Sequence, residues 1–483
     1  MHKLAQLDRA HIWHPFTQMR EWLRREPIVI TAGKGAVLRD AKGREYLDAN
    51  ASIWTNLHGH RHPKIDAAIR RQLNKIAHSS ALGFANEPAS LLAERLVKCA
   101  SLKKQRFTNR GPQLSKIFFS DDGSTAMEVA LKLAYEFARR SGRSQRPRFL
   151  SLAGAYHGDT VGAVSLGHSD LFHKAYAGLL FKSDAVMAPY CYRCPFNRAK
   201  PDRADAREYR KCNWECIGKV EQRVAAQRKK GNPYAAMVVE PLMQGAAGMI
   251  PQPEGWLRRV AEIVRADGTQ LIADEVMTGF GRTGQSSTIG HQPSASLFAS
   301  QREGVQPDFL CLAKGLTGGY LPMAATLTTS TVFDAFLGKY EEFKTFFHGH
   351  SYTGNQLGAA AALASLDLLG TPVNLRTRIK LEQTLREELK SLWPLENVGD
   401  VRQVGLIAGV ELVRNWRTRE PFDLRERAGI RVCEAMARRG VLTRPIGNVL
   451  VLMPAYCTTD AQTQRMVGAM REAIQEVFKQ RRT

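Results

Sequence analysis

Five short apolar segments along the chain each stop abruptly at polar or glycine residues, and stretches with helical spacing lie between them. The segments are residues 116–120, 148–152, 236–239, 270–273 and 309–313. Apolar runs of this length that alternate with helices are typical of a mostly parallel sheet in an α/β fold. Ligands of such sheets bind beyond the carboxyl ends of the strands. We therefore expect functional side chains where these segments end.

The pattern changes after about residue 370. Helical spacing then alternates with strand-like runs at residues 405–412 and 449–453. This predicts a smaller α+β domain over residues 371–483, beside a large domain over residues 66–370. Residues 1–65 are predicted to form an N-terminal segment that joins the small domain.

The 483-residue chain carries 69 Lys plus Arg against 46 Asp plus Glu, a formal net charge of +23. Such a charge attracts anions, but the basic residues are scattered and no nucleic-acid-binding motif accompanies them, so no nucleic-acid partner is expected. No apolar run approaches the roughly 18 residues of a membrane helix, and no secretory signal is visible. We expect a cytoplasmic protein that binds small molecules, with polar surface loops at residues 103–112 and 285–295.

Two predicted strands end in residues suited to amine chemistry. Asp274 follows one apolar segment, and Lys314 follows the next and precedes Gly315. A desolvated lysine can act as a nucleophile, and a carboxylate can hold the protonated pyridine nitrogen of pyridoxal 5′-phosphate. Each residue also has an ordinary alternative, a surface lysine and a helix-capping aspartate. An aspartate at the end of one strand, followed by a lysine and a glycine at the end of the next, favours the cofactor-binding interpretation over either residue alone.

Two other strand-end segments are suited to the same ligand. Gly123 and Ser124 lie where helical spacing begins, so their N–H groups and the hydroxyl could bind a phosphate, although a plain helix cap has the same sequence. Tyr156 offers a ring that could stack on a flat cofactor, although packing within a loop is the commoner role of such a residue.

Together these motifs resemble the class III aminotransferases of fold type I, which depend on pyridoxal 5′-phosphate. The resemblance rests on Gly123-Ser124, residues 156–160, residues 274–284 and Lys314-Gly315. It implies a large, mostly parallel-sheet domain with a smaller α+β domain. It also implies that Lys314 is the catalytic residue and carries the cofactor as a Schiff base. Asp274 would bind the ring nitrogen, Gly123 and Ser124 the phosphate, and Tyr156 the ring face and the substrate.

Three further segments are similar to the biotin-pathway branch of this class, which converts 8-amino-7-oxononanoate to 7,8-diaminononanoate. They are residues 11–19, 53–60 and 444–447. The similarity implies a ping-pong reaction in a homodimer with shared active sites, where residues 348–351 reach the neighbouring subunit's cofactor. It implies cofactor contacts for His350 and Ser351. The implied substrate-binding residues are Phe16, Ile53, Trp54, Tyr156, Gly349 and Arg444, with the Arg444 guanidinium on the substrate carboxylate.

The amino donor of this branch is ordinarily S-adenosylmethionine, but the chain departs from the better-known members that use it at two positions. It has Phe16 where they have Tyr, and Ile53 before Trp54 where they have a Trp pair. Lysine as donor to the same acceptor is therefore an alternative. An ω-amino acid:pyruvate or diamine aminotransferase is a second alternative, favoured if Arg444 meets solvent. A non-catalytic binding protein is a third, and the intact set of catalytic motifs argues against it.

Four of the eight cysteines cluster in a basic insertion, as Cys191-x2-Cys194 and Cys212-x3-Cys216. Thiolates at such spacing can bind a structural zinc ion or an iron–sulfur cluster. Four reduced thiols in a loop are the alternative. A bound metal would stabilise the loop without taking part in amino transfer.

Overall fold

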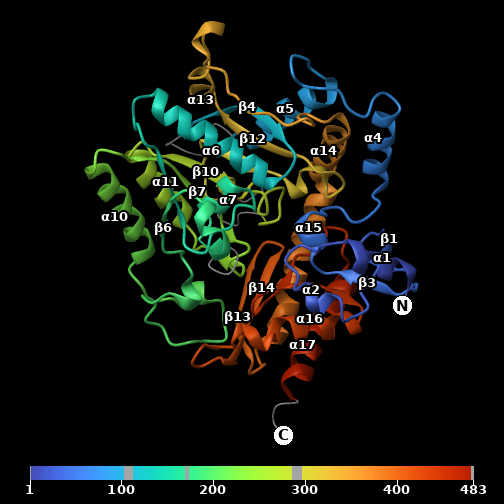
Figure 1. Ribbon diagram of the computed structural model, residues 1–483. Helices are drawn as coiled ribbons and strands as arrows, with labels where there is room; N and C mark the ends of the chain where they lie inside the picture. The colour runs from blue at the N-terminus through green and yellow to red at the C-terminus, as the bar shows by residue number, and fades with distance from the viewer. Residues whose placement is uncertain (1, 103–111, 169–172, 285–295, 480–483) are drawn as a thin grey trace.

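A seven-stranded sheet forms the centre of the computed structural model, which describes residues 2–102, 112–168, 173–284 and 296–479 (Figure 1). Its strands, in spatial order, are β4 (Leu114–Ser120), β12 (Ala324–Thr329), β11 (Phe309–Leu312), β10 (Gln270–Asp274), β7 (Tyr234–Val239), β5 (Arg148–Leu152) and β6 (Asp184–Val186). Neighbouring strands are parallel except at β12, which is antiparallel to both of its neighbours. The predicted α/β fold class with a mostly parallel sheet is confirmed.

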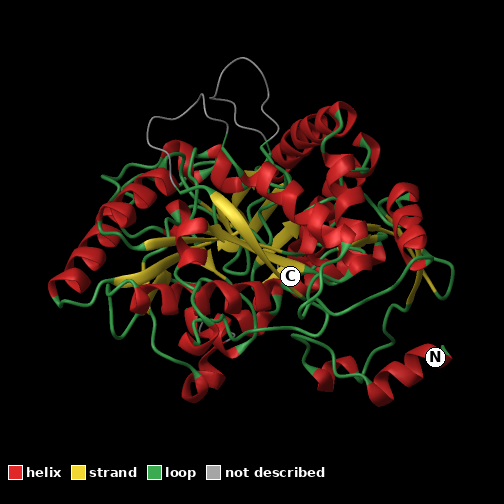
Figure 2. Cartoon of the chain, turned by 90° about the horizontal axis from the view of Figure 1, so that it is seen from above, coloured by secondary structure: helices red, strands yellow, loops and turns green. Residues whose placement is uncertain are grey.

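Helices cover both faces of this sheet, as the view from above shows (Figure 2). The main ones are α4 (Pro63–Leu73), α5 (Glu87–Ala100), α6 (Gly123–Arg140), α10 (Glu215–Lys229), α11 (Trp256–Ala266) and α14 (Gln356–Leu369). All residues of β7, β10 and β11 are buried. Strands that are covered on both faces need apolar side chains on both, which is why they stand out in the sequence as nearly continuous apolar runs.

The antiparallel strand β12 was not anticipated from the sequence. It is a short run that follows a glycine-rich turn, and apolar periodicity does not reveal the direction of a strand. Leu312 at the end of β11 pairs with Ala325 near the beginning of β12. The segment that leads into β12 therefore lies at the edge where the parallel strands end.

A second sheet belongs to the C-terminal part of the chain. Its strands are β13 (Val398–Val404), β14 (Ile407–Asn415), β18 (Val449–Leu452) and β17 (Pro445–Ile446), with β15 (Glu420–Pro421) paired to β14. An apolar cluster joins this sheet to α15 (Pro372–Leu389), α16 (Ala428–Arg438) and α17 (Asp460–Lys479). This is the smaller α+β part of the fold.

The N-terminal strands pair with this smaller part. A separate sheet contains β1 (Ile30–Lys34), β2 (Val37–Asp40) and β3 (Glu45–Asp48), and β3 runs parallel to β16 (Val441–Leu442). The blue N-terminal elements and the red C-terminal ones accordingly lie side by side in Figure 1. The domain limits at residues 65 and 370 stay a prediction.

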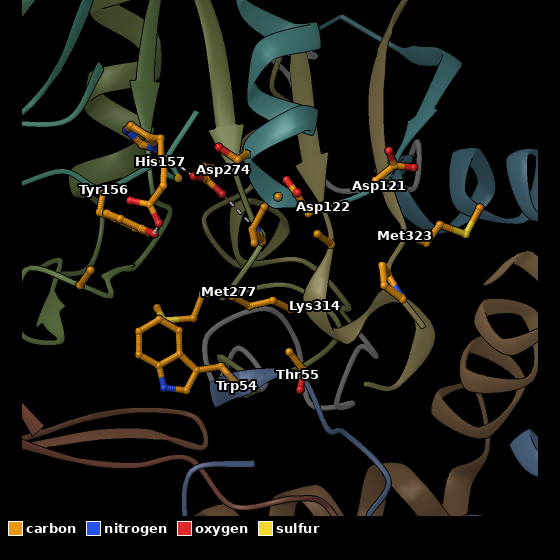
Figure 3. A pocket seen from close by; sticks show the side chains of 18 of the residues that line it. Trp54, Thr55, Asp121, Asp122, Tyr156, His157, Asp274, Met277, Lys314 and Met323 are labelled. Atoms are coloured by element: carbon orange, nitrogen blue, oxygen red, sulfur yellow. Dashed lines mark hydrogen bonds and ion pairs between the residues drawn. The ribbon is translucent and has the colours of Figure 1, made fainter. Parts of the chain in front are cut away.

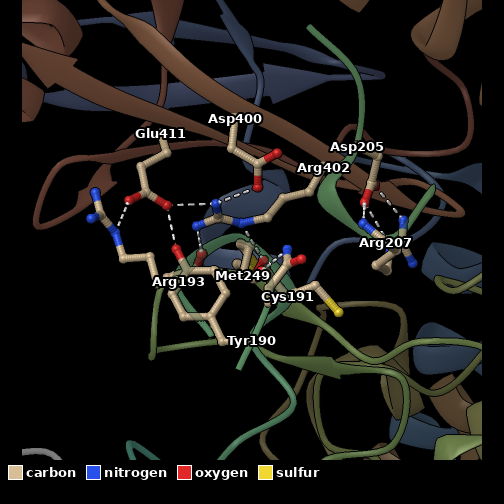
Figure 4. A network of polar contacts seen from close by, with 11 residues as sticks. Tyr190, Cys191, Arg193, Asp205, Arg207, Met249, Asp400, Arg402 and Glu411 are labelled. Atoms are coloured by element: carbon tan, nitrogen blue, oxygen red, sulfur yellow. Dashed lines mark hydrogen bonds and ion pairs between the residues drawn. The ribbon is translucent and has the colours of Figure 1, made fainter. Parts of the chain in front are cut away.

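A buried polar network connects the C-terminal sheet with two neighbouring segments, one just before β9 (Ile250–Pro251) and one between β6 and α10 (Figure 4). The guanidinium of Arg402 on β13 bonds to Asp400 Oδ2 at 2.9 Å and Glu411 Oε2 at 2.6 Å, and its Nε donates to the Met249 carbonyl at 2.7 Å. Arg193, in the segment between β6 and α10, donates to the other oxygen of Glu411 at 2.6 Å. The segment that carries the clustered cysteines is therefore tied to the C-terminal sheet.

Of the two predicted polar loops, residues 103–111 and 285–295 lie outside the described residues. Within the described ranges, no helix is long and apolar enough to cross a membrane.

Candidate active site

A cavity of about 740 Å³ lies at the edge of the sheet where the parallel strands end. Its wall includes Lys314, Asp274, Gly123, Ser124, Tyr156 and Trp54, all of which were predicted site residues. Residues 319–323, which lead into β12, and the loop at residues 156–160 complete much of the remaining wall. The structure thus brings together six predicted residues that are widely separated in the sequence.

Lys314 lies in the middle of this wall (Figure 3). It follows β11 with φ of 41°, a left-handed conformation that is uncommon for a residue with a side chain. Burial lowers the pKa of the Lys314 ammonium, and the carboxylates of Asp274 and Glu240 oppose this effect. Its Nζ lies 4.5 Å from the centroid of the Trp54 ring. A lysine with a lowered pKa is partly neutral and can act as a nucleophile.

Asp274 ends β10 and is held by two hydrogen bonds. His157 Nδ1 lies 2.8 Å from Asp274 Oδ2, and the Val276 N–H donates to Oδ1 at 3.1 Å. Burial opposes a charge on His157, but the hydrogen bond with Asp274 outweighs it and raises the pKa of the imidazole. Sequence analysis missed this role of His157 because the two residues are 117 positions apart. The hydrogen bond with His157 orients one carboxylate oxygen of Asp274.

Glu240 is a second buried carboxyl group in the wall, and it too was missed as a site residue. It accepts hydrogen bonds from the N–H of Gly245 at 2.7 Å and of Tyr156 at 3.3 Å. Burial raises the pKa of Glu240 to about 7, with a smaller contribution from the Asp274 carboxylate and opposition from His157. Glu240 therefore fixes the backbone that carries Tyr156 while it lies close to the charged groups of the site.

The N-terminus of α6 opens toward the cavity. Asp122 caps the helix by accepting a hydrogen bond from the Thr125 N–H at 2.9 Å. Ser124 Oγ in turn accepts one from the Thr160 N–H at 3.0 Å. Gly158 packs against the same serine so closely that an added Cβ would lie 2.3 Å from Ser124 Oγ. An 18-residue helix that begins at a cavity wall is suited to binding an anion.

The aromatic side chains of the wall come from two loops. The Tyr156 hydroxyl donates to Asp159 Oδ2 at 2.6 Å, which fixes the ring at the side of the cavity. Trp54 ends a turn in which residues 51–54 all have positive φ although none is glycine. Such strained backbone persists only where surrounding contacts hold it, and it is concentrated at functional sites.

The other predicted substrate and cofactor residues do not line the cavity of this chain. Phe16 and Ile53 are 62% and 46% exposed, and Arg444 is exposed as well. His350 Nδ1 lies 3.4 Å from the carboxylate of Asp121, a residue of the wall. The carbonyl of Ser351 accepts a hydrogen bond from His78, and a Cβ added to Gly349 would meet open space. The roles assigned to these residues stay predictions.

The four clustered cysteines line a separate small cavity. Among the residues that the structure describes, no group of three or more His, Cys, Asp or Glu side chains is arranged to hold a metal ion.

Comparison with known proteins assigns the chain to a family. Residues 19–474 match the class III aminotransferases. The chain is 47% identical over 477 residues to an adenosylmethionine-8-amino-7-oxononanoate aminotransferase from Geobacter sulfurreducens, with 98% of each sequence covered. A protein of the same name from Nitratidesulfovibrio vulgaris is 48% identical, and the match covers 98% of this chain and 81% of that protein.

Solved structures agree with the sequence comparison. The crystal structure of the adenosylmethionine-8-amino-7-oxononanoate aminotransferase from Methanocaldococcus jannaschii has a TM-score of 0.86 at 38% identity, with 98% of each chain covered. An amine transaminase from an uncultivated Pseudomonas species, solved in its PLP-bound form, has a TM-score of 0.84 at 33% identity, covering 96% of this chain and 98% of its own. The chain is therefore an aminotransferase and belongs to the class III family.

Proposed function

We propose that this aminotransferase converts 8-amino-7-oxononanoate to 7,8-diaminononanoate in biotin biosynthesis, with pyridoxal 5′-phosphate as cofactor and S-adenosylmethionine as amino donor. The observation that carries the proposal is the cavity wall, where Lys314 and Asp274 from neighbouring strands meet the N-terminus of α6. The names of the relatives, which share 41–48% identity with this chain over nearly its full length, supply the substrate and the donor.

The residues of the cavity fit pyridoxal 5′-phosphate. The α6 N-terminus with Gly123 and Ser124 would bind the phosphate. Asp274, held by His157, would bind the protonated ring nitrogen, and Tyr156 would lie against the ring. Lys314 would hold the cofactor covalently through Nζ. The lowered pKa of this lysine and the fixed orientation of the aspartate are what such a cofactor requires.

Bound pyridoxal 5′-phosphate supplies an electron sink that stabilises negative charge at the donor's Cα. Lys314, once displaced by the amine of the donor, would take the proton from that Cα and deliver it within the same cavity. His157 would hold the Asp274 carboxylate in one orientation throughout the reaction. Burial of these groups keeps their electrostatic interactions strong.

Arg444 bears on the choice of acceptor. The biotin-pathway hypothesis places the Arg444 guanidinium on the carboxylate of 8-amino-7-oxononanoate. The Arg444 side chain, however, is exposed and does not line the cavity. An ω-amino acid:pyruvate or diamine aminotransferase is therefore kept as the second candidate.

We further propose a cytoplasmic homodimer with shared active sites. Residues 348–351 lie beside large apolar side chains that are exposed, among them Phe347 at 69% and Tyr352 at 61%. Exposed apolar groups that gather near one segment are typical of an interface. All eight cysteines are free, as expected in a reducing compartment. Light scattering of the purified protein measures the assembly directly.

The amino donor can be identified by a half-reaction. The protein, loaded with pyridoxal 5′-phosphate, is mixed in turn with S-adenosylmethionine, lysine and a simple ω-amino acid, and the visible absorbance of the bound cofactor is followed. Loss of absorbance with S-adenosylmethionine, and its return on addition of 8-amino-7-oxononanoate, is expected. The Lys314→Ala variant should show neither change, whereas Lys390→Ala, at an exposed lysine paired with Glu387, should behave like the wild type.

Other results lead to other assignments. Reaction with lysine alone, reversed by the same oxononanoate, would make lysine the donor. Reaction with ω-amino acids and none with the other two would refute the biotin-pathway proposal and support the second candidate.

A further inference from the structure

The four clustered cysteines surround one cavity of about 10 Å³. Cys191 and Cys216 are buried, and Cys194 and Cys212 are half-buried. The rest of the wall consists of Pro189, Asn197, Arg210, Glu215 and Pro253. A space of roughly 10–15 Å³ holds about one water-sized probe. All four thiols therefore border one small space that a single ion could occupy.

Local structure places each cysteine pair at this cavity. Cys191 lies in a single 3₁₀ turn, η2 (Cys191–Arg193), and Cys194 follows it directly. Cys212 precedes α10, and Cys216 lies in the first turn of that helix. Two pairs of cysteines that are joined by short turns and face one another are the usual frame of a structural zinc site.

The charges around the cavity suit an anionic centre. Four thiolates and one Zn²⁺ carry a net charge of −2. Arg210 Nη1 donates to Cys212 Sγ at 3.1 Å. Residues 190–216 contain seven Lys and Arg against four Asp and Glu, a net charge of +3. A cation that donates to a ligating sulfur stabilises the thiolate form.

The segment has little apolar core of its own, so a metal centre would add to its stability. Between β6 and α10 it contains only η2 and the four-residue helix α9 (Ala206–Tyr209). Its apolar cluster consists of Cys191, Tyr192 and Ala206, with two further tyrosines packed against it. Yet it contacts the C-terminal sheet through Arg193 and Glu411, and through Arg203, which donates to the Val398 carbonyl at 2.6 Å.

We propose that Cys191, Cys194, Cys212 and Cys216 bind one structural Zn²⁺ ion, which holds this segment in the shape that contacts the C-terminal sheet. The thiols line the cavity without being arranged as a ligand set. Their side chains therefore turn toward its centre as the ion binds, and each ligating thiol gives up its proton to solvent. The ion lies outside the cavity that holds Lys314 and takes no part in amino transfer.

Metal analysis tests this directly. The full-length protein is produced in zinc-supplemented medium, purified without metal-affinity resin, and analysed for zinc and iron by mass spectrometry. About one zinc per chain is expected. Cys194→Ser and Cys212→Ser should each lose the zinc and unfold at lower urea concentration. Cys99→Ser, at a half-buried cysteine outside the cluster, should keep the zinc.

Three results would overturn the proposal. They are a wild-type protein without stoichiometric zinc, stoichiometric iron in its place, or zinc that is retained in both cluster variants. If the variants do not fold, the zinc content of the wild type decides alone. The half-reaction with amino donors is measured on the same preparation, so failure of the metal site is distinguished from failure of the proposed enzyme activity.

Discussion

Replacement of Gly158 by alanine is expected to weaken the binding of pyridoxal 5′-phosphate about 10- to 150-fold. An added Cβ would lie 2.3 Å from Ser124 Oγ, whereas ordinary contacts begin at 3.4 Å, so the serine must move by 3.4 − 2.3 = 1.1 Å. A shift of that size removes one charge-assisted hydrogen bond to the phosphate, which is worth about 1.5–3 kcal/mol. Each 1.4 kcal/mol corresponds to about a tenfold change in affinity.

The matched control is Gly154→Ala. Gly154 also has a positive φ, of 74°, but an added Cβ would lie 3.5 Å from Ala247 and would leave Ser124 in place. Each apoprotein is titrated with pyridoxal 5′-phosphate, visible absorbance gives the Kd, and circular dichroism verifies that both variants are folded. Equal Kd values for the two variants would refute the idea that Ser124 holds the phosphate.

Three further substitutions test buried groups. Arg402→Met leaves Asp400 buried without its cation, while Glu411 keeps its ion pair with Arg193. It should lower the free energy of unfolding by about 3–5 kcal/mol in urea, whereas Arg444→Met at an exposed site should change it by less than about 0.5 kcal/mol; similar values for both would contradict a structural role of the network. His157→Phe removes a hydrogen bond to Asp274 and should lower kcat/KM at least about tenfold; unchanged kinetics would show that His157 does not position the aspartate. Glu240→Gln tests pH dependence. The unfolded chain loses the Glu240 proton near its ordinary pKa of 4.5, but the folded protein keeps it until about pH 7, so stability falls as the pH rises between these values. From pH 5 to pH 8 the wild-type apoprotein should lose up to about 3 kcal/mol more than the Gln variant, since the difference of 2.5 pKa units is worth about 1.36 kcal/mol per unit; equal losses in urea denaturation would exclude this effect.

The sequence was sufficient to predict the parallel strands and the residues at their ends. Buried parallel strands are apolar on both faces, so the polar residues that terminate them, such as Asp274 and Lys314, stand out. Contacts between distant segments leave no such pattern. His157 was noticed only as part of a motif, because nothing in its spacing connects it to Asp274. Glu240 directly follows the apolar segment 236–239, but its burial and its altered pKa depend on the folded structure.

The cysteine cluster is a site that the sequence predicted only in part. The spacing showed two close pairs of cysteines, but only the folded structure shows that both pairs line the same cavity. The exposure of Arg444 was likewise beyond sequence reasoning, because β17 and its preceding turn take their orientation from the C-terminal sheet. The roles of residues at an interface between two copies of the chain also remain predictions, because they depend on contacts between distant parts of the structure.

The buried position of Arg402 has a consequence for how ligands enter the site. Its guanidinium is fully buried and bonds at once to both carboxylates of the C-terminal sheet and to the backbone at residues 248–249. A hinge motion that moved the C-terminal sheet away from residues 248–249 would leave those two buried carbonyls and two of the guanidinium N–H groups without hydrogen-bond partners. We therefore expect ligands to enter through local movement of rim loops, into a cavity that already has its final shape. Such a preformed cavity needs no free energy for closure, so it discriminates between ligands by the fixed shape of its walls.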